Sequence, residues 1–224
     1  MSGVRGGVNG ERGGSRTGRT QEERSAAMRL RLLDATIDCL VEYGYAGTTT
    51  TKVADRAGVT RGAQVHHFPT KNDLVVSAIR YLAARRTELA FGELDRLRES
   101  ADPIGDALDL LWEMHQGPVF SATVELWVAS RTDPELRGHM SVTEPVATGS
   151  LVEFGKVLLP DHATHPEFLH AVYTAMDVVR GILIASWATK DKAELDARWA
   201  RAKRHLRILF ECLMAEANST AALP

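Results

Sequence analysis

The sequence predicts an all-α fold, and three observations support that prediction. Apolar residues recur at intervals of three and four along most of the chain, which is the spacing of amphipathic helices. Residues that cap helices, and glycine or proline beyond them, mark where those helices begin and end. No segment alternates apolar and polar residues between hairpin turns, so we expect essentially no sheet. The 224 residues, 44% of them apolar, suffice for one large domain or two modest ones.

The first residues differ from the rest. Residues 1–19 are rich in glycine and arginine and hold almost no bulky apolar side chain, so we expect a disordered arm. Whether its arginines touch phosphates or the arm has no role stays open. The first helix is expected from Thr20 to Gly44. Thr20 and Glu23 have the spacing of a capping box, and apolar positions continue in helical register to Val41.

Two short helices follow the first one. One is expected over 51–57, where Gly58 can adopt the left-handed conformation that ends a helix. The other is the segment RGAQVHHF, which Thr60 can cap and which Pro69 closes because proline cannot continue a helix.

The remaining chain is also predicted to be helical. Thr70 and Asp73 repeat the capping-box spacing and open a long helix from 71 to about 98. Two of the later helices open with aspartate followed by proline. The aspartate can cap the helix, and the proline suits its first position. These helices are expected at 103–115, 118–130, 134–159, 166–189 and 192–217. We therefore predict two domains, residues 20–70 and residues 71–224.

Composition excludes several protein classes. No stretch approaches the roughly 18 apolar residues that a membrane-spanning helix needs, and the longest apolar patch is 181–188. The start lacks the apolar stretch of a secretory signal. Cys39 and Cys212 lie far apart in helical patterns and are expected to be buried free thiols. We expect a cytoplasmic protein that does not bind membranes.

The charge is unevenly distributed along the chain. Residues 1–80 carry 12 Lys and Arg against 8 acidic residues, a net charge of +4. Residues 81–224 carry 15 against 21, a net charge of -6, so the whole chain has -2. A basic segment suits a domain that binds a polyanion, although an excess of this size also arises by chance.

The two short helices form a helix-turn-helix pattern. Small apolar residues such as Val53, Ala54 and Ala57 let the helices cross closely, and Gly58 permits the sharp turn. The second helix can then enter the major groove of DNA, which is about 12 Å wide, and present side chains to base edges. A purely structural helical hairpin uses the same small residues, so spacing alone leaves both interpretations open.

The stretch TTTTKVADRAGVTRGAQVHHFPTKNDLV resembles the DNA-binding domain of the TetR family of transcriptional regulators. The resemblance covers residues of about 25 to 75 closely and the helical remainder more loosely. The matching residues are Thr50 or Thr51, Ala54, Ala57, Gly58, Val59, Thr60, Gly62, His66, His67, Phe68 and Lys71. Gln64 stands where the family commonly has an apolar residue, and Val65 stands where it commonly has a tyrosine that contacts phosphate.

The resemblance implies a set of DNA-binding residues. Arg61, Gly62 and Ala63 are expected to face base edges, and Arg61 can bind guanine through two hydrogen bonds. Gln64 is either a semi-buried amide or a reader of adenine. The residues expected to hold phosphates are Thr50, Thr51, His66, His67 and Lys71, and Thr60 completes the set.

The resemblance also implies a homodimer and a ligand pocket in the second domain. The helices at 166–189 and 192–217 are expected to form the dimer interface, although the same stripe would suit an internal core. Its residues are Ala171, Ala175, Val178, Ile182, Ala185, Leu206, Leu209, Phe210 and Leu213. The expected pocket residues are Trp112, His115, Phe120, Trp127, Phe154, Tyr173, Asp177 and Arg180. Family members are mostly repressors that bind a palindromic operator and leave it when a small-molecule inducer binds.

Two other classes of protein were weighed. The segment DHATHPE, residues 161–167, offers histidines and acids, but no second group has the spacing of metal ligands, and the segment is predicted to be a polar loop. No glycine-rich or nucleophile motif of an enzyme is present, so no catalytic residue and no cofactor is expected. A helical adaptor without affinity for DNA remains the alternative to a regulator.

Overall fold

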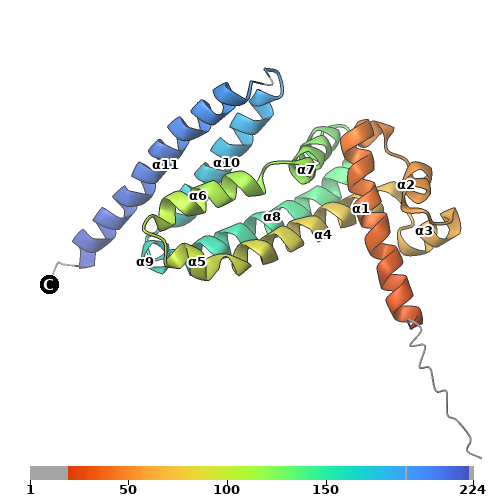
Figure 1. Ribbon diagram of the computed structural model, residues 1–224, viewed down its shortest axis with the longest axis horizontal. Helices are drawn as coiled ribbons and strands as arrows, with labels where there is room; N and C mark the ends of the chain where they lie inside the picture. The colour runs from red at the N-terminus through yellow and green to blue at the C-terminus, as the bar shows by residue number, and fades with distance from the viewer. Residues whose placement is uncertain (1–19, 190, 222–224) are drawn as a thin grey trace, which may run out of the picture.

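The computed structural model describes residues 20–189 and 191–221, and over those residues it contains helices and no strands (Figure 1). The predicted all-α fold is therefore confirmed for the described part of the chain. The arm expected at 1–19 lies outside the described residues. We call residues 20–70 the head and the described residues from 71 onward the body.

The head contains three helices, α1 (Gln21–Gly47), α2 (Thr50–Ala57) and α3 (Arg61–His67). The capping box at Thr20 is present in both directions, since Glu23 N–H donates to Thr20 and the Glu23 carboxylate accepts from the Thr20 N–H. The helical conformation breaks at Gly44, at the predicted residue, and one more turn follows to Gly47. Thr49 caps α2, one residue before the threonines that the sequence suggested.

Gly58 and Thr60 shape the turn between α2 and α3. Gly58 has φ 64° and ψ 39°, the left-handed conformation that glycine adopts without steric cost. Thr60 caps α3 by accepting a hydrogen bond from the Ala63 N–H at 3.2 Å. The predicted order of short helix, glycine turn and short helix is thus confirmed.

The long helix predicted from 71 to about 98 is interrupted. It consists of α4 (Lys71–Gly92) and α5 (Leu94–Arg98), with Glu93 between them. The Glu93 N–H donates to the Ala90 carbonyl at 3.0 Å, three residues back, so the last turn is tighter than an α-helix. Gly92 lowers the helix propensity at this point. The prediction of one continuous helix from 71 to about 98 was therefore wrong.

Five of the six remaining helices lie close to the predicted ranges. They are α6 (Pro103–Met114), α7 (Pro118–Ala129), α8 (Pro134–Leu158), α10 (Phe168–Ser186) and α11 (Lys192–Ala221). Asp102 and Asp133 cap α6 and α8 as expected. The sixth, α9 (Pro160–Ala163), stands where a polar loop was predicted. It contacts α8, α10 and α11, and its His162 is buried.

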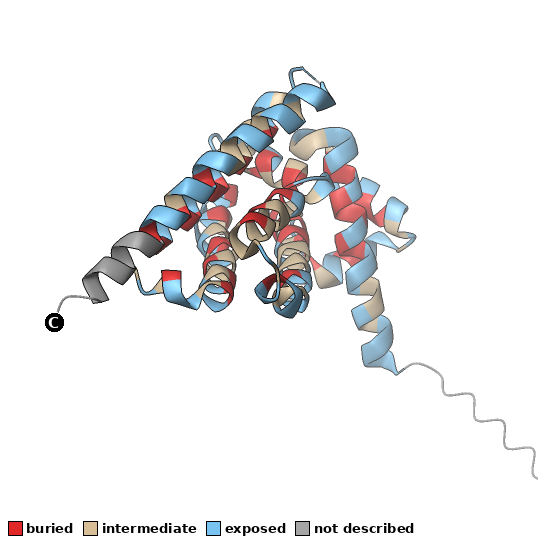
Figure 2. Ribbon diagram, turned by 60° about the vertical axis from the view of Figure 1, so that its left-hand side comes forward, coloured by how far each residue is buried: buried red, intermediate tan, exposed pale blue. Residues whose placement is uncertain are grey.

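The elements are arranged with the head at one end and α10 and α11 at the other (Figure 1). Between them α4 and α8 lie side by side along the body, and α1 packs on both α4 and α7. Buried residues line the inward faces of the helices (Figure 2). The core of the head continues into the body through Ala122 and Leu126 of α7 and Leu136 and Met140 of α8. A shift of α7 or α8 would therefore be felt in the head.

One apolar helix and one thiol differ from the expectations drawn from the sequence. Among the described helices, α10 is long and apolar enough to cross a membrane by length and composition, but its Phe168, Met176 and Val179 are buried in the protein core. Core helices of soluble proteins pass the same test. Both cysteines are free, and Cys39 is buried as expected. Cys212 is exposed, because it lies on the face of α11 opposite Phe210 and Leu213.

Candidate DNA-binding surface and ligand cavity

One face of α3 is exposed and free of contacts that would hold it inside the protein. Arg61, Gly62, Val65 and His66 are exposed, and Ala63 is half-buried beside them. These positions follow the helical repeat, so they form a continuous outward surface. A β-carbon placed on Gly62 would meet no atom within 4 Å, so this position is open to close approach. An exposed helix face of this kind is what a helix that enters the major groove presents to base edges.

Backbone groups suited to phosphate surround this surface. Thr49, Thr60 and Thr70 each cap a helix by accepting a backbone N–H from three residues later. Thr51 is exposed in the first turn of α2, Thr50 is half-buried there, and Arg61 is exposed in the first turn of α3. Helix N-termini favour anions because their first N–H groups have no partner within the helix.

The two histidines at the end of α3 differ in environment. His66 is exposed, whereas His67 is half-buried, and their ring centroids are 5.4 Å apart. Burial, followed by the neighbouring His66, lowers the pKa of His67. His67 is therefore neutral near pH 7, and it can offer phosphate a hydrogen bond but no charge.

Gln64, expected among the DNA-binding residues, is completely buried. Its Nε2 donates to the Phe68 carbonyl at 2.7 Å, while its Oε1 is buried without a hydrogen-bond partner among the described residues. The semi-buried alternative is the one the structure matches, and reading of adenine by Gln64 is ruled out in this conformation. Val65 occupies the outward face beside it and is 44% exposed. In the sequence, Val65 stood out only because it replaces the tyrosine that the family commonly has at this position.

Lys71 also differs from expectation. Its Nζ donates inward to the Tyr45 carbonyl at 2.5 Å and lies 3.9 Å from the centroid of the Tyr45 ring. Burial lowers the pKa of Lys71. The side chain ties the start of α4 to the end of α1. In this structure it therefore points toward Tyr45 and is not placed for the phosphate contact that was expected of it.

Lys71 belongs to a polar cluster between head and body, which we call the junction cluster: Tyr45, Lys71, Asn72, Glu125 and Asp133. The Tyr45 hydroxyl lies 2.5 Å from Asn72 Oδ1 and 3.1 Å from Asp133 Oδ2. The Tyr45 N–H donates to Glu125 Oε2 of α7 at 3.1 Å. Burial, and then the hydrogen bond to Asp133, raise the pKa of Tyr45 to about 12. Tyr45 stays protonated and holds the head to α7 and to the N-cap of α8.

Gly44 is required for this arrangement. It has φ 65°, and a β-carbon there would lie 2.9 Å from Glu125 Oε2. Only glycine lets the α1 end approach the Glu125 carboxylate so closely while the backbone is left-handed.

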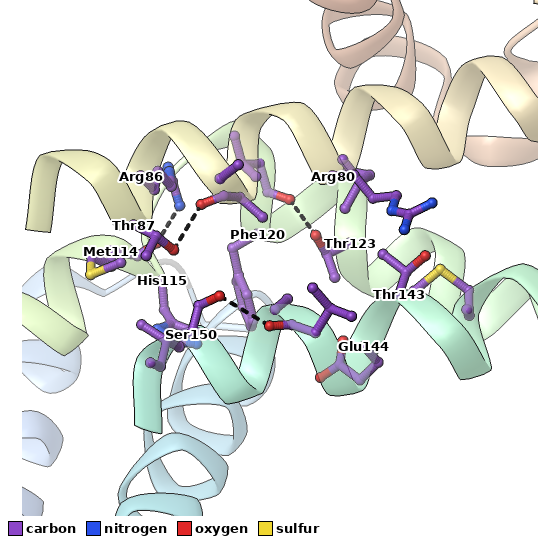
Figure 3. Close-up of a pocket in the computed structure, with 18 of the residues that line it drawn as sticks. Arg80, Arg86, Thr87, Met114, His115, Phe120, Thr123, Thr143, Glu144 and Ser150 are labelled. Carbon is purple, nitrogen blue, oxygen red and sulfur yellow. Dashed lines mark hydrogen bonds between the residues drawn. The ribbon is translucent and has the colours of Figure 1, made fainter. Parts of the chain in front are cut away.

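A cavity of about 340 Å³ lies in the body between α4, α7, α8 and α10 (Figure 3). Most of its wall is apolar, and polar groups enter it at a few places. The lining residues from α4 are Ile79, Arg80, Ala83, Ala84, Arg86 and Thr87; from α6 to α7 they are Met114, His115, Val119, Phe120, Thr123 and Trp127. Those from α8 and α10 are Met140, Thr143, Glu144, Val146, Ala147, Ser150, Leu151 and Arg180.

His115 is a neutral acceptor in this wall. Its Nδ1 lies 2.9 Å from the Leu111 carbonyl, which can only accept, so Nδ1 carries the proton and Nε2 the lone pair. Burial lowers the pKa of His115 to about 4. The imidazole is consequently uncharged at neutral pH, with its ring edge toward Phe120 at a centroid distance of 5.7 Å.

The eight expected pocket residues divide into two groups. His115, Phe120, Trp127 and Arg180 line the cavity. The other four lie elsewhere: Trp112 stacks on Trp199 in the core with ring centroids 4.7 Å apart, Phe154 lines a second, smaller apolar cavity, and Tyr173 and Asp177 are exposed on α10. Sequence composition did not reveal which face of α10 turns inward. It also missed the wall that α4 contributes.

The stripe expected at a dimer interface is mostly internal. Ala171, Ala175, Leu206, Phe210 and Leu213 are buried within the protomer, where they pack α10 and α11 together and onto the body. Val178, Ile182 and Leu209 are half-buried, and Ala185 is exposed. The faces left exposed on the two helices carry other apolar residues: Tyr173, Ile184 and Trp187 on α10 and Ile208 on α11.

The histidines and acids of segment 161–167 do not converge. His162 is buried, and its Nε2 has no hydrogen-bond partner within the part of the chain that the structure describes, whereas Asp161 and Glu167 are exposed. Among the described residues, no three side chains of His, Cys, Asp or Glu are placed to hold a metal ion.

Comparison with known proteins identifies the family. The sequence model of the family described as "Bacterial regulatory proteins, tetR family" matches residues 32–78. The HTH-type transcriptional regulator CymR of Pseudomonas putida is 34% identical over 186 residues, which span 80% of this chain and 88% of CymR. The HTH-type transcriptional repressor AcnR of Corynebacterium diphtheriae is 27% identical over 127 residues, 56% of this chain and 62% of AcnR.

Solved structures agree in fold. The transcriptional regulator FadR of Bacillus subtilis, crystallised with stearoyl-CoA, superposes with a TM-score of 0.61 at 16% identity, covering 79% of this chain and 96% of FadR. The matched segment of the family model spans α2, the glycine turn and α3, where the exposed helix face lies. The chain belongs to the TetR family of bacterial transcriptional regulators.

Proposed function

We propose that this protein is a transcriptional repressor of the bacterial cytoplasm that binds a palindromic operator as a homodimer and leaves it when a small molecule occupies the body cavity. The observation that carries the proposal is the exposed face of α3. Arg61, Gly62, Val65 and His66 are exposed together there, and Val65 is an apolar side chain that is 44% exposed. They suit a surface that is covered only when DNA is bound.

The residues have distinct expected roles on DNA. Arg61 at the start of α3 can form two hydrogen bonds with a guanine, a contact worth roughly 1–3 kcal/mol of discrimination. Gly62 and Ala63 allow close approach, and Val65 can contact a thymine methyl group. Thr51 and the N-termini of α2 and α3 suit phosphates, with His66 and His67 at the other end of α3.

Two copies are needed because one α3 reads only a few base pairs. The exposed faces of α10 and α11 suit a contact between copies. Tyr173, Gly181 and Ile184 share one face of α10, and a β-carbon on Gly181 would meet no atom within 4 Å, so another helix can approach there. Ile208 of α11 is 55% exposed and extends this apolar surface. Burying such a surface between two copies is favourable.

The junction cluster gives the route by which a ligand acts on the head. The helices α7 and α8 line the cavity, and they also supply Glu125 and Asp133, which hold Tyr45. A ligand that binds best when α7 and α8 are displaced shifts the population toward that form. The heads would then be wrongly spaced for two operator half-sites, which lie about 34–36 Å apart.

The test is selection of bound fragments from random duplex DNA by the full-length protein. We expect a palindrome with half-sites about one helical turn apart. Arg61→Ala should relax the preference at one position of each half-site, and Arg85→Ala, an exposed arginine on α4 far from α3, should leave the selected sequence unchanged. If the protein retains no duplex DNA, the result would favour a helical adaptor and refute the proposal.

A further inference from the structure

The walls of the body cavity suit an apolar ligand body. Phe120 and Trp127 present aromatic rings, and Ile79, Met140 and Leu151 add aliphatic surface. Placing a polar ligand body against such walls would leave its polar groups without partners, which is costly. The polar groups of the wall must therefore select a small part of the ligand.

The charges in the wall do not cancel. Arg80, Arg86 and Arg180 line the cavity together with one carboxylate, Glu144. Glu144 is already engaged, since it accepts from Arg180 at 3.2 Å, from Trp127 Nε1 at 3.3 Å and from Thr148 at 3.3 Å. His115 adds no charge because it is neutral. Two arginines thus remain without a carboxylate in the wall.

Arg86 is the more informative of these two. It is half-buried, and its donors reach the main-chain carbonyls of Met114 and of Gln116, the latter at 2.9 Å. No carboxylate forms an ion pair with it among the described residues. These two carbonyls accept from two of its five N–H groups and do not neutralise its charge, and burial lowers its pKa. An anion placed beside Arg86 would remove this imbalance.

The hydroxyl groups of the wall cannot replace the arginines in holding an anion. Thr87, Thr123, Thr143 and Ser150 each donate to a main-chain carbonyl four residues earlier in their own helix. Their hydroxyl hydrogens are used in these bonds, so their oxygens can act only as acceptors (Figure 3). Charge-assisted donors in this wall are therefore supplied by arginine. A cationic ligand would instead add to an existing excess of positive charge.

The cations are placed at two ends. Figure 3 shows Arg86 close to Met114 and His115 at one end of the cavity, and Arg80 near Thr143 and Glu144 at the other. Arg80 is exposed, so water screens its charge, whereas Arg86 lies deeper. The Arg86 end is where an anion gains most.

We infer that the cavity binds an anionic amphiphile, a molecule with an apolar ring or chain and one carboxylate, and that Arg86 holds the carboxylate. This inference rests on the proposed function, in which the cavity is the inducer site. It adds the chemical class of the inducer and the residue that selects it. A purely structural Arg86, which only ties α4 to the loop before α7, would leave the cavity without a preference for acids.

The experiment measures binding to the full-length protein without DNA, by titration calorimetry with matched probes. The acids are naphthoate and decanoate, the neutral partners are naphthamide and decanamide, and the cations are naphthylmethylammonium and decylammonium. We expect at least one acid to bind about tenfold or more tightly than its amide, a difference of about 1.4 kcal/mol, and the cations to bind most weakly. Amides or cations that bind as tightly as the acids, or acids that do not bind, would overturn the inference.

Variants separate recognition from structure. Arg86→Met should remove the preference for acid over amide while the amide still binds, which also reports that the cavity is folded. Arg86→Lys should retain the preference, and Arg85→Met, which changes the exposed neighbour, should behave as the parent protein. A preference for acids that survives in Arg86→Met contradicts the assignment.

A separate titration of the operator complex distinguishes the two proposals. Acids that bind the free protein but never release it from DNA would refute the inducer role and leave the ligand class standing. Release by amides or cations, with no effect of acids, would support the inducer role and overturn the ligand class.

Discussion

Replacing Tyr45 by phenylalanine tests the connection between head and body. The change removes one hydroxyl and keeps the ring that lies against Lys71. The hydroxyl contacts Asn72, which is 7% exposed, and Asp133, which caps α8. Leaving a buried polar group without its partner costs roughly 1–3 kcal/mol, so we expect the free energy of unfolding to fall by about 2 kcal/mol.

The matched control is Tyr43→Phe. Tyr43 stands two residues earlier and is exposed. Its hydroxyl accepts from Arg56 at 3.3 Å, and a hydrogen bond to the exposed Glu42 raises its pKa. Its loss should change stability by less than about 0.5 kcal/mol. Both variants are unfolded in urea at equal protein concentration, because dimerisation makes apparent stability depend on concentration. A second assay measures operator affinity with and without a ligand that releases the parent protein.

The two assays give different information. Tyr45→Phe should retain operator binding, since α3 is unchanged. It should lose part of the ligand effect because the hydroxyl contact to Asp133 at the start of α8 is gone, while the backbone contact of residue 45 to Glu125 of α7 remains. If Tyr45→Phe is as stable as Tyr43→Phe and responds fully to ligand, the junction cluster has no role in coupling and the reasoning fails.

Three further outcomes are expected. Burial lowers the pKa of His115 to about 4, so the unfolded chain binds more protons than the folded protein between about pH 6.5 and 4. The free energy of unfolding should therefore fall by up to about 3 kcal/mol as the pH drops through that window. An NMR titration that places the pKa of His115 near 6.5 would contradict this. Gly58→Ala, at φ 64°, should destabilise the protein by about 1 kcal/mol in thermal or urea unfolding, and no loss would show that the turn relaxes. Gln64→Leu should leave the selected operator unchanged and stability within about 1 kcal/mol, because its Oε1 already lacks a partner; an altered operator would place Gln64 on the bases.

Local signals in the sequence predicted the helices well. The capping box at Thr20, the glycine stop at Gly58 and the caps at Thr60 and Asp133 depend on residues three or four apart, and the structure contains all of them. The interruption of the helix after Gly92 was not predicted, because a single glycine within a periodic apolar pattern does not reveal that the helix ends there.

The side-chain environments depended on distant partners and were less predictable. Tyr45 meets Asn72 27 residues away and Asp133 88 residues away, and no local pattern encodes such a cluster. Tyr173 and Asp177 were assigned to a pocket because polar and aromatic residues often line one, but which face of α10 turns inward depends on packing against α11. The burial of Gln64 depends likewise on a hydrogen bond to Phe68 that the family pattern, with an apolar residue there, does not suggest.

The most direct test of the account is a titration of the full-length protein, in the dimeric form that we propose, with its selected duplex, followed by fluorescence anisotropy at low and at physiological salt. We expect two protomers to bind each duplex, with affinity that falls as salt rises because phosphate contacts release counterions. Arg61→Ala should weaken binding to the selected duplex, by roughly 1–3 kcal/mol for each half-site, and change binding to an unrelated duplex much less. A folded dimer that binds no duplex at low ionic strength would contradict the assignment of α3 as a DNA-reading helix.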